Sequence, residues 1–159
     1  MTVNGQAAIS GQPRTITLNP AGQSTLITTV VTAQNSTTKS YRIAVSRGVS
    51  ANNNLSGLTI SSGTLNFNPN TTSYTVNVGS NVTSVTVRPT LADTSATMTV
   101  NGQATNSGVT RTFQLGATGP VTNTPIIIIV TAQNDTQKTY SVNVVRAALG
   151  GNNNLSALT

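Results

Sequence analysis

Asp93 and Asp135 are the only acidic residues of this chain, and the sequence contains neither histidine nor cysteine. General acid–base catalysis and nucleophilic catalysis both need a second group that exchanges a proton with the first. Two acids at unrelated places in the sequence supply no such pair, and a thiolate metal site requires cysteine. We therefore expect no enzymatic activity, no catalytic residue, no bound metal and no cofactor.

Lys39 and Lys138 each follow an asparagine near a predicted strand end, a combination that suggests the intramolecular isopeptide bonds of some surface adhesins. That reaction needs a buried acid to shuttle protons. Asp135 precedes Lys138, but the residue at the corresponding position before Lys39 is Ser36. The preferred interpretation is therefore two ordinary solvated lysines.

The formal charge of +6 arises from eight basic residues against two acids. A phosphate-binding surface needs clustered Lys and Arg, often with aromatic residues that stack on bases. We interpret the dispersed arginines as isolated solubilising charges and expect no nucleic-acid partner; they are Arg14, Arg42, Arg47, Arg88, Arg111 and Arg146. The longest apolar run, Ile126 to Val130, is far shorter than the roughly 20 residues that cross a bilayer, so no membrane span is expected.

Six Asn-x-Ser/Thr sequons are candidate glycosylation sites, and they matter only in a source that glycosylates its proteins. They lie at Asn35, Asn54, Asn70, Asn81, Asn134 and Asn154. Sugar-binding sites usually present an aromatic ring for stacking. Tyr41, Tyr74 and Tyr140 fall on predicted core faces, so the sequence predicts no such platform.

A repeat organises the chain. Val31-Thr-Ala-Gln-Asn35, followed by Lys39, Tyr41, Val45 and Arg47, recurs 99 residues later as Val130-Thr-Ala-Gln-Asn134 with Lys138, Tyr140, Val144 and Arg146. A shared register of that length indicates a duplicated folding unit. Thr, Ser and Asn dominate the polar residues, charged residues make up only 6%, and Thr and Val favour strands. An all-β fold is expected.

The alternation of apolar and polar residues predicts the strands. Residues 1–47 form the C-terminal half of one repeat, with strands at 1–3, 14–18, 26–33 and 41–45, and residues 48–54 form a short linker. Residues 55–147 form a complete repeat, in which Ile126 to Ala132 is a central strand. About seven strands in such a unit are typical of an immunoglobulin-like sandwich of Greek-key type.

Residues 148–159 are predicted to be a second linker and the first strand of a further repeat, because Asn152 to Ser156 repeat Asn52 to Ser56. Met1 stands where the repeat has Met98, so the chain is expected to be an excerpt from a longer protein. Strands that begin or end inside a unit offer unpaired backbone groups to another chain. The candidate assembly strands contain Met1, Val3, Leu155 and Leu158.

The complete repeat resembles the cadherin-like β-sandwich domain that occurs in tandem in bacterial surface and secreted proteins, and residues 1–47 resemble its second half. The resemblance rests on Leu55-Ser-Gly-Leu58, Gly63-Thr-Leu65, Phe67-Asn-Pro69, Tyr74-Thr-Val76, Val85-Thr-Val87, Val100-Asn-Gly102, Val130-Thr-Ala132 and Tyr140 through Arg146. It implies an extracellular spacer, stalk or adhesive module without common catalytic residues. The usual short turn after Leu115 is replaced by an extended loop, Gly116 to Pro125.

True cadherins stiffen their junctions with calcium, which takes six to eight oxygen ligands, several of them carboxylates. Two acids cannot build that site, and the neutral amides of Asn52 to Asn54 bind calcium poorly. The leading hypothesis is therefore an extracellular or cell-surface structural protein. Its tandem sandwiches would form a stalk or filament, with neighbouring repeats or subunits of the same protein as partners. The alternative is a surface adhesin or carbohydrate-binding module that takes host or environmental glycans on loops such as Gly116 to Pro125.

Overall fold

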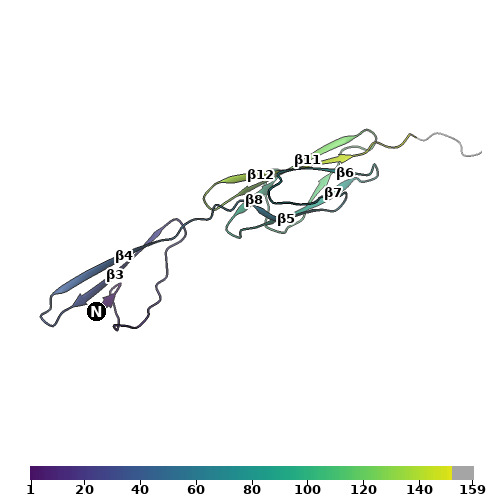
Figure 1. Ribbon diagram of the computed structural model, residues 1–159. Coiled ribbons are helices and arrows are strands. Elements are labelled where there is room, and N and C mark those ends of the chain that lie inside the picture. The colour runs from purple at the N-terminus through teal and green to yellow at the C-terminus, as the bar shows by residue number, and fades with distance from the viewer. Residues whose placement is uncertain (152–159) are drawn as a thin grey trace, which may run out of the picture. The chain divides into compact units, whose positions relative to one another are not determined.

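Segments rich in Thr and Val form β-strands throughout the computed structural model, which describes residues 1–151 (Figure 1). The fold is all-β, as the sequence predicts. Within the described residues, no helix is long and apolar enough to cross a membrane. The chain divides into two compact units: unit 1 spans Met1–Val49, and unit 2 spans Ser50–Thr159.

Unit 2 is a sandwich of two sheets. The first sheet has three strands in the order β10-β7-β5, and the second has five in the order β6-β12-β11-β8-β9. The strands are β5 (Leu55–Ile60), β6 (Ser73–Val78), β7 (Ser84–Leu91), β8 (Thr97–Val100), β9 (Gln103–Ala104), β10 (Arg111–Gln114), β11 (Thr122–Thr131) and β12 (Gln137–Arg146). The sandwich predicted for this repeat is thereby confirmed.

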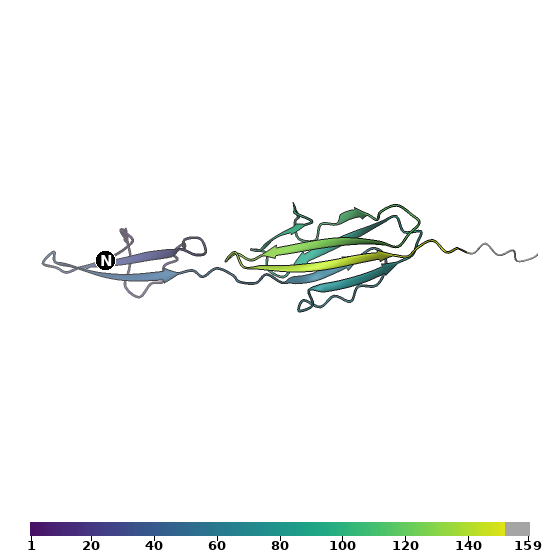
Figure 2. The same cartoon turned by 90° about the horizontal axis from the view of Figure 1, so that it is seen from above.

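The core of unit 2 lies between the two sheets, and β11 contributes most plainly to it. In Figure 2, β11 and β12 run side by side as the green and yellow-green arrows. Ile126, Ile128 and Val130 of β11 are fully buried, whereas Ile127 and Ile129 are only half-buried on the outer face. The apolar run therefore belongs to a central strand, as predicted, but side chains on alternate faces meet different surroundings.

Unit 1 is a single four-stranded sheet in the order β2-β1-β3-β4. Its strands are β1 (Thr2–Val3), β2 (Gln6–Ala7), β3 (Ser24–Thr32) and β4 (Thr38–Ser46). The β1–β2 hairpin turns at Asn4 and Gly5, whose φ angles of 48° and 78° are those that an Asn-Gly turn accepts. The Asn4 side chain also accepts a hydrogen bond of 2.9 Å from the Thr28 backbone N–H, so it joins the turn to β3.

The predicted strand at 14–18 does not form in unit 1. Its counterpart in unit 2 is β10, which pairs only with β7. The repeat half in unit 1 has no segment that corresponds to β7, so residues 14–18 lack the neighbour that would make them a strand. The prediction was wrong because a strand depends on its partner as well as on its own alternation.

The extended loop predicted from Gly116 to Pro125 is shorter than expected. Residues 122–125 belong to β11 and pair with Asn143 to Arg146 of β12. Pro125 is tolerated there because β8, the other neighbour of β11, pairs only with Ile128 to Thr131. The ladder is therefore one-sided at the proline.

Candidate functional site

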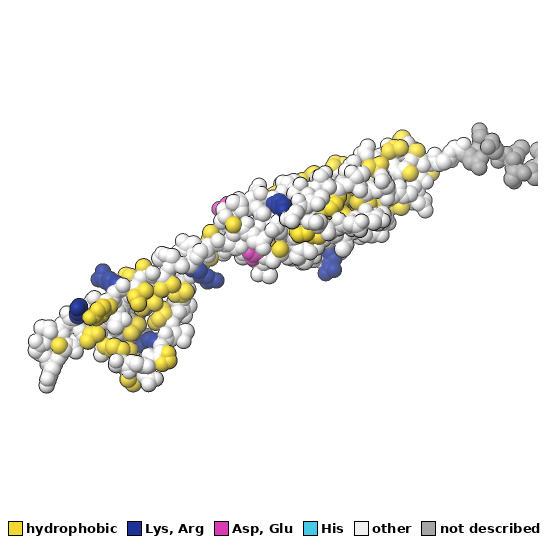
Figure 3. All heavy atoms as spheres, in the orientation of Figure 1, with side chains coloured by type: hydrophobic (Ala, Val, Ile, Leu, Met, Phe, Trp, Pro, Cys, Tyr) yellow, Lys and Arg dark blue, Asp and Glu magenta, His cyan; other side chains and the backbone are white. Residues whose placement is uncertain are grey.

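The sheet of unit 1 presents a mainly apolar surface that the described residues cover only in part, which we call the open face. It consists of alternate residues of β3 and β4 that share one side of the sheet: Ile27, Thr29, Val31, Tyr41, Ile43 and Val45. Val31, Tyr41 and Ile43 are exposed, and Ile27, Thr29 and Val45 are half-buried. Hydrophobic side chains gather at the surface of unit 1 in Figure 3. The exposed fraction is 51% for Tyr41 and 59% for Ile43.

The same positions are buried in unit 2. Tyr140 and Val142, which correspond to Tyr41 and Ile43, are both 0% exposed beneath the three-stranded sheet. Burial of a Val, Ile or Tyr side chain of this kind stabilises a domain by about 1.5–3 kcal/mol each. The prediction that the tyrosines lie in the core was therefore correct for Tyr140 and wrong for Tyr41. It was only partly correct for Tyr74, which is half-buried.

Unit 1 also has a strand edge that no strand among residues 1–151 covers. In unit 2, the outer edge of β12 is covered by β6, which pairs with it in parallel along six residues from Ser73 to Val78. Its counterpart β4 is the last strand of the sheet in unit 1. An edge strand of nine residues with free N–H and C=O groups is a template for another strand.

The residues predicted to lie in assembly strands have different surroundings. Val3 lies in β1, which pairs with β2 on one side and β3 on the other, and Met1 precedes that strand. The N-terminal strand is therefore already paired, and the free long edge of unit 1 is that of β4. Leu155 and Leu158 lie outside the described residues.

A polar cluster fastens the start of β5 to β12 in unit 2. The Tyr140 hydroxyl accepts a hydrogen bond of 3.2 Å from the Leu55 N–H and donates one of 3.0 Å to the Pro69 carbonyl. Lys138 Nζ donates to the same carbonyl at 2.7 Å and to Asn54 Oδ1 at 3.0 Å. Lys138 is half-buried, so the interpretation of an ordinary solvated lysine was wrong for this copy.

The geometry around Lys138 is that of a hydrogen bond to Asn54. An isopeptide bond would need a buried acid beside the pair. The Asp93 carboxylate is instead bonded to Ser50 and Ser95, and Asp135 is exposed in the β11–β12 turn. The arrangement therefore supports anchoring of the segment before β5 and supplies no catalyst for a covalent link.

Arg146 is the largest fully buried side chain of unit 2, with 1% of its surface exposed. Its guanidinium donates to the carbonyls of Gly116 at 3.0 Å, Val82 at 3.5 Å and Ala117. The interpretation as a solubilising charge was wrong for this residue. Its counterpart Arg47 is exposed because the segments that would bury it are missing from unit 1.

Residues 50–54, predicted as part of the linker, belong to unit 2 and are hydrogen-bonded to its other segments. The Ser50 N–H donates to Gln133 Oε1 at 3.1 Å, its carbonyl accepts from the Asn134 N–H at 3.0 Å, and its hydroxyl donates to the Asp93 carboxylate. The Ser50 hydroxyl, and after it the Ser95 N–H and hydroxyl, lower the pKa of Asp93 below its ordinary value of 3.8. Asp93 thus holds the incoming chain against the turn between β7 and β8.

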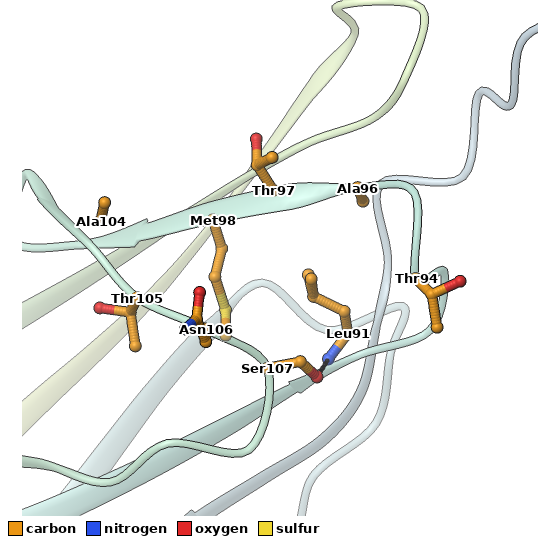
Figure 4. Close-up of a pocket in the computed structure, with 9 residues that line it drawn as sticks. All are labelled: Leu91, Thr94, Ala96, Thr97, Met98, Ala104, Thr105, Asn106 and Ser107. Atoms are coloured by element: carbon orange, nitrogen blue, oxygen red, sulfur yellow. Dashed lines mark hydrogen bonds between the residues drawn. The ribbon is translucent and has the colours of Figure 1, made fainter. Parts of the chain in front are cut away.

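A groove of about 330 Å³ opens beside β7, β8 and β9 in unit 2 (Figure 4). It is lined by Leu91, Thr94, Ala96, Thr97, Met98, Ala104, Thr105, Asn106 and Ser107. Its polar groups are partly engaged within the protein: Ser107 Oγ accepts from the Leu91 N–H at 2.9 Å, and Thr105 Oγ1 donates to the Gln103 carbonyl at 3.0 Å. None of the nine residues is aromatic, so the groove offers no ring for sugar stacking.

The candidate glycosylation sites differ in accessibility. Asn35, Asn70 and Asn81 are exposed, whereas Asn54 and Asn134 are half-buried. Asn54 Oδ1 is bonded to Lys138. Asn35 and Asn134 close equivalent turns, since each Oδ1 accepts from the N–H and hydroxyl of the threonine two residues later. Asn154 lies outside the described residues.

Comparison with known proteins gives one family. A family model described as "Cadherin-like beta sandwich domain" matches residues 1–48 and residues 55–147. No curated protein matches the chain. The first match lies in unit 1 and the second in unit 2, so both units carry the sequence of the same domain although only unit 2 has both sheets.

Proposed function

Because the chain belongs to the cadherin-like β-sandwich family, we propose that it is part of an extracellular stalk or filament assembled from tandem sandwich domains. Membership of this family indicates an adhesive or structural role outside the cell, and the domain itself is a non-catalytic structural fold. The proposed partners are neighbouring repeats or subunits of the same protein. Antibody labelling of intact cells, before and after surface proteolysis, tests the location.

The observation that carries the proposal is the difference between the two copies of one repeat. Tyr140 and Val142 are buried in unit 2, and their counterparts Tyr41 and Ile43 are exposed in unit 1. A sheet whose apolar face and strand edge are exposed to water is less stable than the same sheet with another segment covering them. The open face and the edge of β4 therefore favour strand-mediated contact between units.

Assembly can be measured with the 159-residue chain itself. Sedimentation velocity over a range of concentrations and negative-stain microscopy are expected to show association beyond the monomer. Ile43→Lys on the open face is expected to weaken the association constant by about tenfold or more, because a buried unpaired ammonium is costly.

Ala44→Lys is the matched control, since Ala44 is exposed on the opposite side of the same strand. It introduces the same charge and is expected to leave association nearly unchanged. A chain that stays monomeric at every concentration, or an equal loss in both variants, would contradict the proposed assembly.

A further inference from the structure

The strands of unit 1 pair in the same register as the corresponding strands of unit 2. Ile27 pairs with Ile43 in unit 1 as Ile126 pairs with Val142 in unit 2. Thr2 pairs with Val30 as Thr99 pairs with Ile129, and Thr2 pairs with Ala7 as Thr99 pairs with Ala104. Strands β2, β1, β3 and β4 therefore reproduce four strands of the five-stranded sheet of unit 2, in the same order.

The parts that unit 1 lacks come from one continuous segment of the repeat. In unit 2, residues 50–97 supply β6 at the edge of β12, and they supply β5 and β7 over the core face. The third strand of the three-stranded sheet, β10, corresponds to residues 14–18. That sequence is already present in unit 1, without the β7 neighbour that would pair with it.

Three polar side chains of unit 1 match contacts that unit 2 makes with this same segment. Tyr140, the counterpart of Tyr41, accepts from the Leu55 N–H and donates to the Pro69 carbonyl. Lys138, the counterpart of Lys39, binds Asn54 and Pro69. Arg146, the counterpart of Arg47, donates to the Val82 carbonyl and also to the carbonyls of Gly116 and Ala117. Each of these three side chains therefore contacts at least one residue between 50 and 97.

The local geometry of these groups is also preserved. Lys39 Nζ lies 5.4 Å from the centre of the Tyr41 ring, and Lys138 Nζ lies 5.2 Å from the centre of the Tyr140 ring. Unit 1 therefore presents an apolar face, an unpaired strand edge and three polar side chains in the arrangement that holds residues 50–97 in unit 2. Two open faces packed on each other would leave the tyrosine, lysine and arginine groups without those backbone partners.

We propose that unit 1 is an acceptor for the first part of another repeat of this protein, a segment with the sequence pattern of residues 50–97. The segment adds a strand parallel to β4, lays two strands over the open face, and pairs with residues 14–18. Residues 152–159 begin such a pattern, because they repeat residues 52–59 at seven of eight positions. The inference rests on the proposed assembly function and names the segment through which it occurs.

The test is a chain in which a second copy of residues 50–97 directly precedes residues 1–159, so that Met1 takes the place of Met98. Amide hydrogen exchange is followed by nuclear magnetic resonance along β4. Protection there is expected to rise by about 1,000-fold or more, because exchange would then require the opening of a complete domain. Within the extended chain, Tyr41→Phe should accelerate exchange of the added Leu55 amide by roughly tenfold relative to the same chain with Tyr41, since its buried partner is lost.

The control is the same extended chain with Val76→Asp and Val87→Asp in the added copy only, since these valines are buried in unit 2. It is expected to leave β4 exchanging as in the original chain. Equal protection with the control segment, or no gain with the native one, would overturn the acceptor role. The native polypeptide of residues 50–97 added in trans gives a second measurement, with 1:1 binding expected and no binding of the Asp-substituted form.

The two proposals fail in different ways. If the original chain associates, and the extended chain associates equally well without gaining the protection, assembly uses another surface, and the acceptor role is overturned while the proposed function stands. If the extended chain gains the protection but the original chain never associates, the acceptor role stands and the assembly function fails.

Discussion

Tyr140→Phe is the most direct test of how the segment before β5 is held in unit 2. The substitution keeps the ring, which is 0% exposed, and removes only the hydroxyl. The Pro69 carbonyl loses the hydrogen bond from Tyr140 but keeps the 2.7 Å bond from Lys138, so it remains paired and contributes little to the cost. The Leu55 N–H, however, loses the acceptor that it has at 3.2 Å, and Leu55 is itself fully buried.

The expected cost follows from that unpaired donor. A buried N–H without a partner destabilises a protein by about 1–3 kcal/mol, which lowers the melting temperature of a domain of this size by roughly 4–20 °C. Urea unfolding of unit 2, followed by circular dichroism, measures the free energy of unfolding. Hydrogen exchange at the Leu55 amide gives a local measurement of the same loss.

The repeat provides the control, because Tyr41 occupies the same position in unit 1 and is half exposed. Tyr41→Phe is expected to change stability by less than about 0.5 kcal/mol. If Tyr140→Phe is equally silent, or if the two variants cost the same, the hydroxyl does not hold the Leu55 amide and the reasoning is refuted.

Three further predictions concern the folded state of unit 2. Arg146→Ala is expected to lower the free energy of unfolding by about 2–4 kcal/mol, because it removes charged donors from buried carbonyls and leaves a cavity. Arg47→Ala, the control, should lower it by less than about 0.5 kcal/mol. Urea unfolding measures both variants. Gly63→Ala should destabilise more than Gly102→Ala, since both glycines have positive φ but only at Gly63 would an added Cβ collide with β6. Since the pKa of Asp93 lies below 3.8 in the folded protein, its contribution to stability is present above that pH and lost as pH falls through the folded pKa. Asp93→Asn should flatten this dependence in urea titrations over roughly pH 2–5, the range that spans 3.8 and the lower folded pKa.

The repeat made much of the fold predictable. The alternation in β12 and the apolar run of β11 indicated a core strand pair, and the Asn-Gly dipeptides at 4–5 and 101–102 are of the type that accepts the positive φ angles found there. Both signals are local, because the period of two and the tolerance of positive φ depend on neighbouring residues alone. The predicted strand at 14–18 failed because its formation depends on a partner strand distant in the sequence.

The roles of single charged and polar residues were less predictable. Arg47 and Arg146 have the same neighbours in sequence, yet one is exposed and the other is buried against three carbonyls. Lys39 and Lys138 differ in the same way. No local pattern separates the members of these pairs, because burial depends on residues far away in the chain: Asn54 and Pro69 contact Lys138, and Val82, Gly116 and Ala117 contact Arg146.

The sequence by itself determined that the chain is all-β, that one unit is repeated, and which positions of each strand share a face. These properties follow from backbone preferences and side-chain period. Only the tertiary structure decided that the same face is a buried core in unit 2 and an open surface in unit 1. It also showed that the free edge is β4, while β1 is already paired. Whether an apolar face is a core or a docking surface depends on what covers it, and covering segments come from elsewhere in the chain or from another copy.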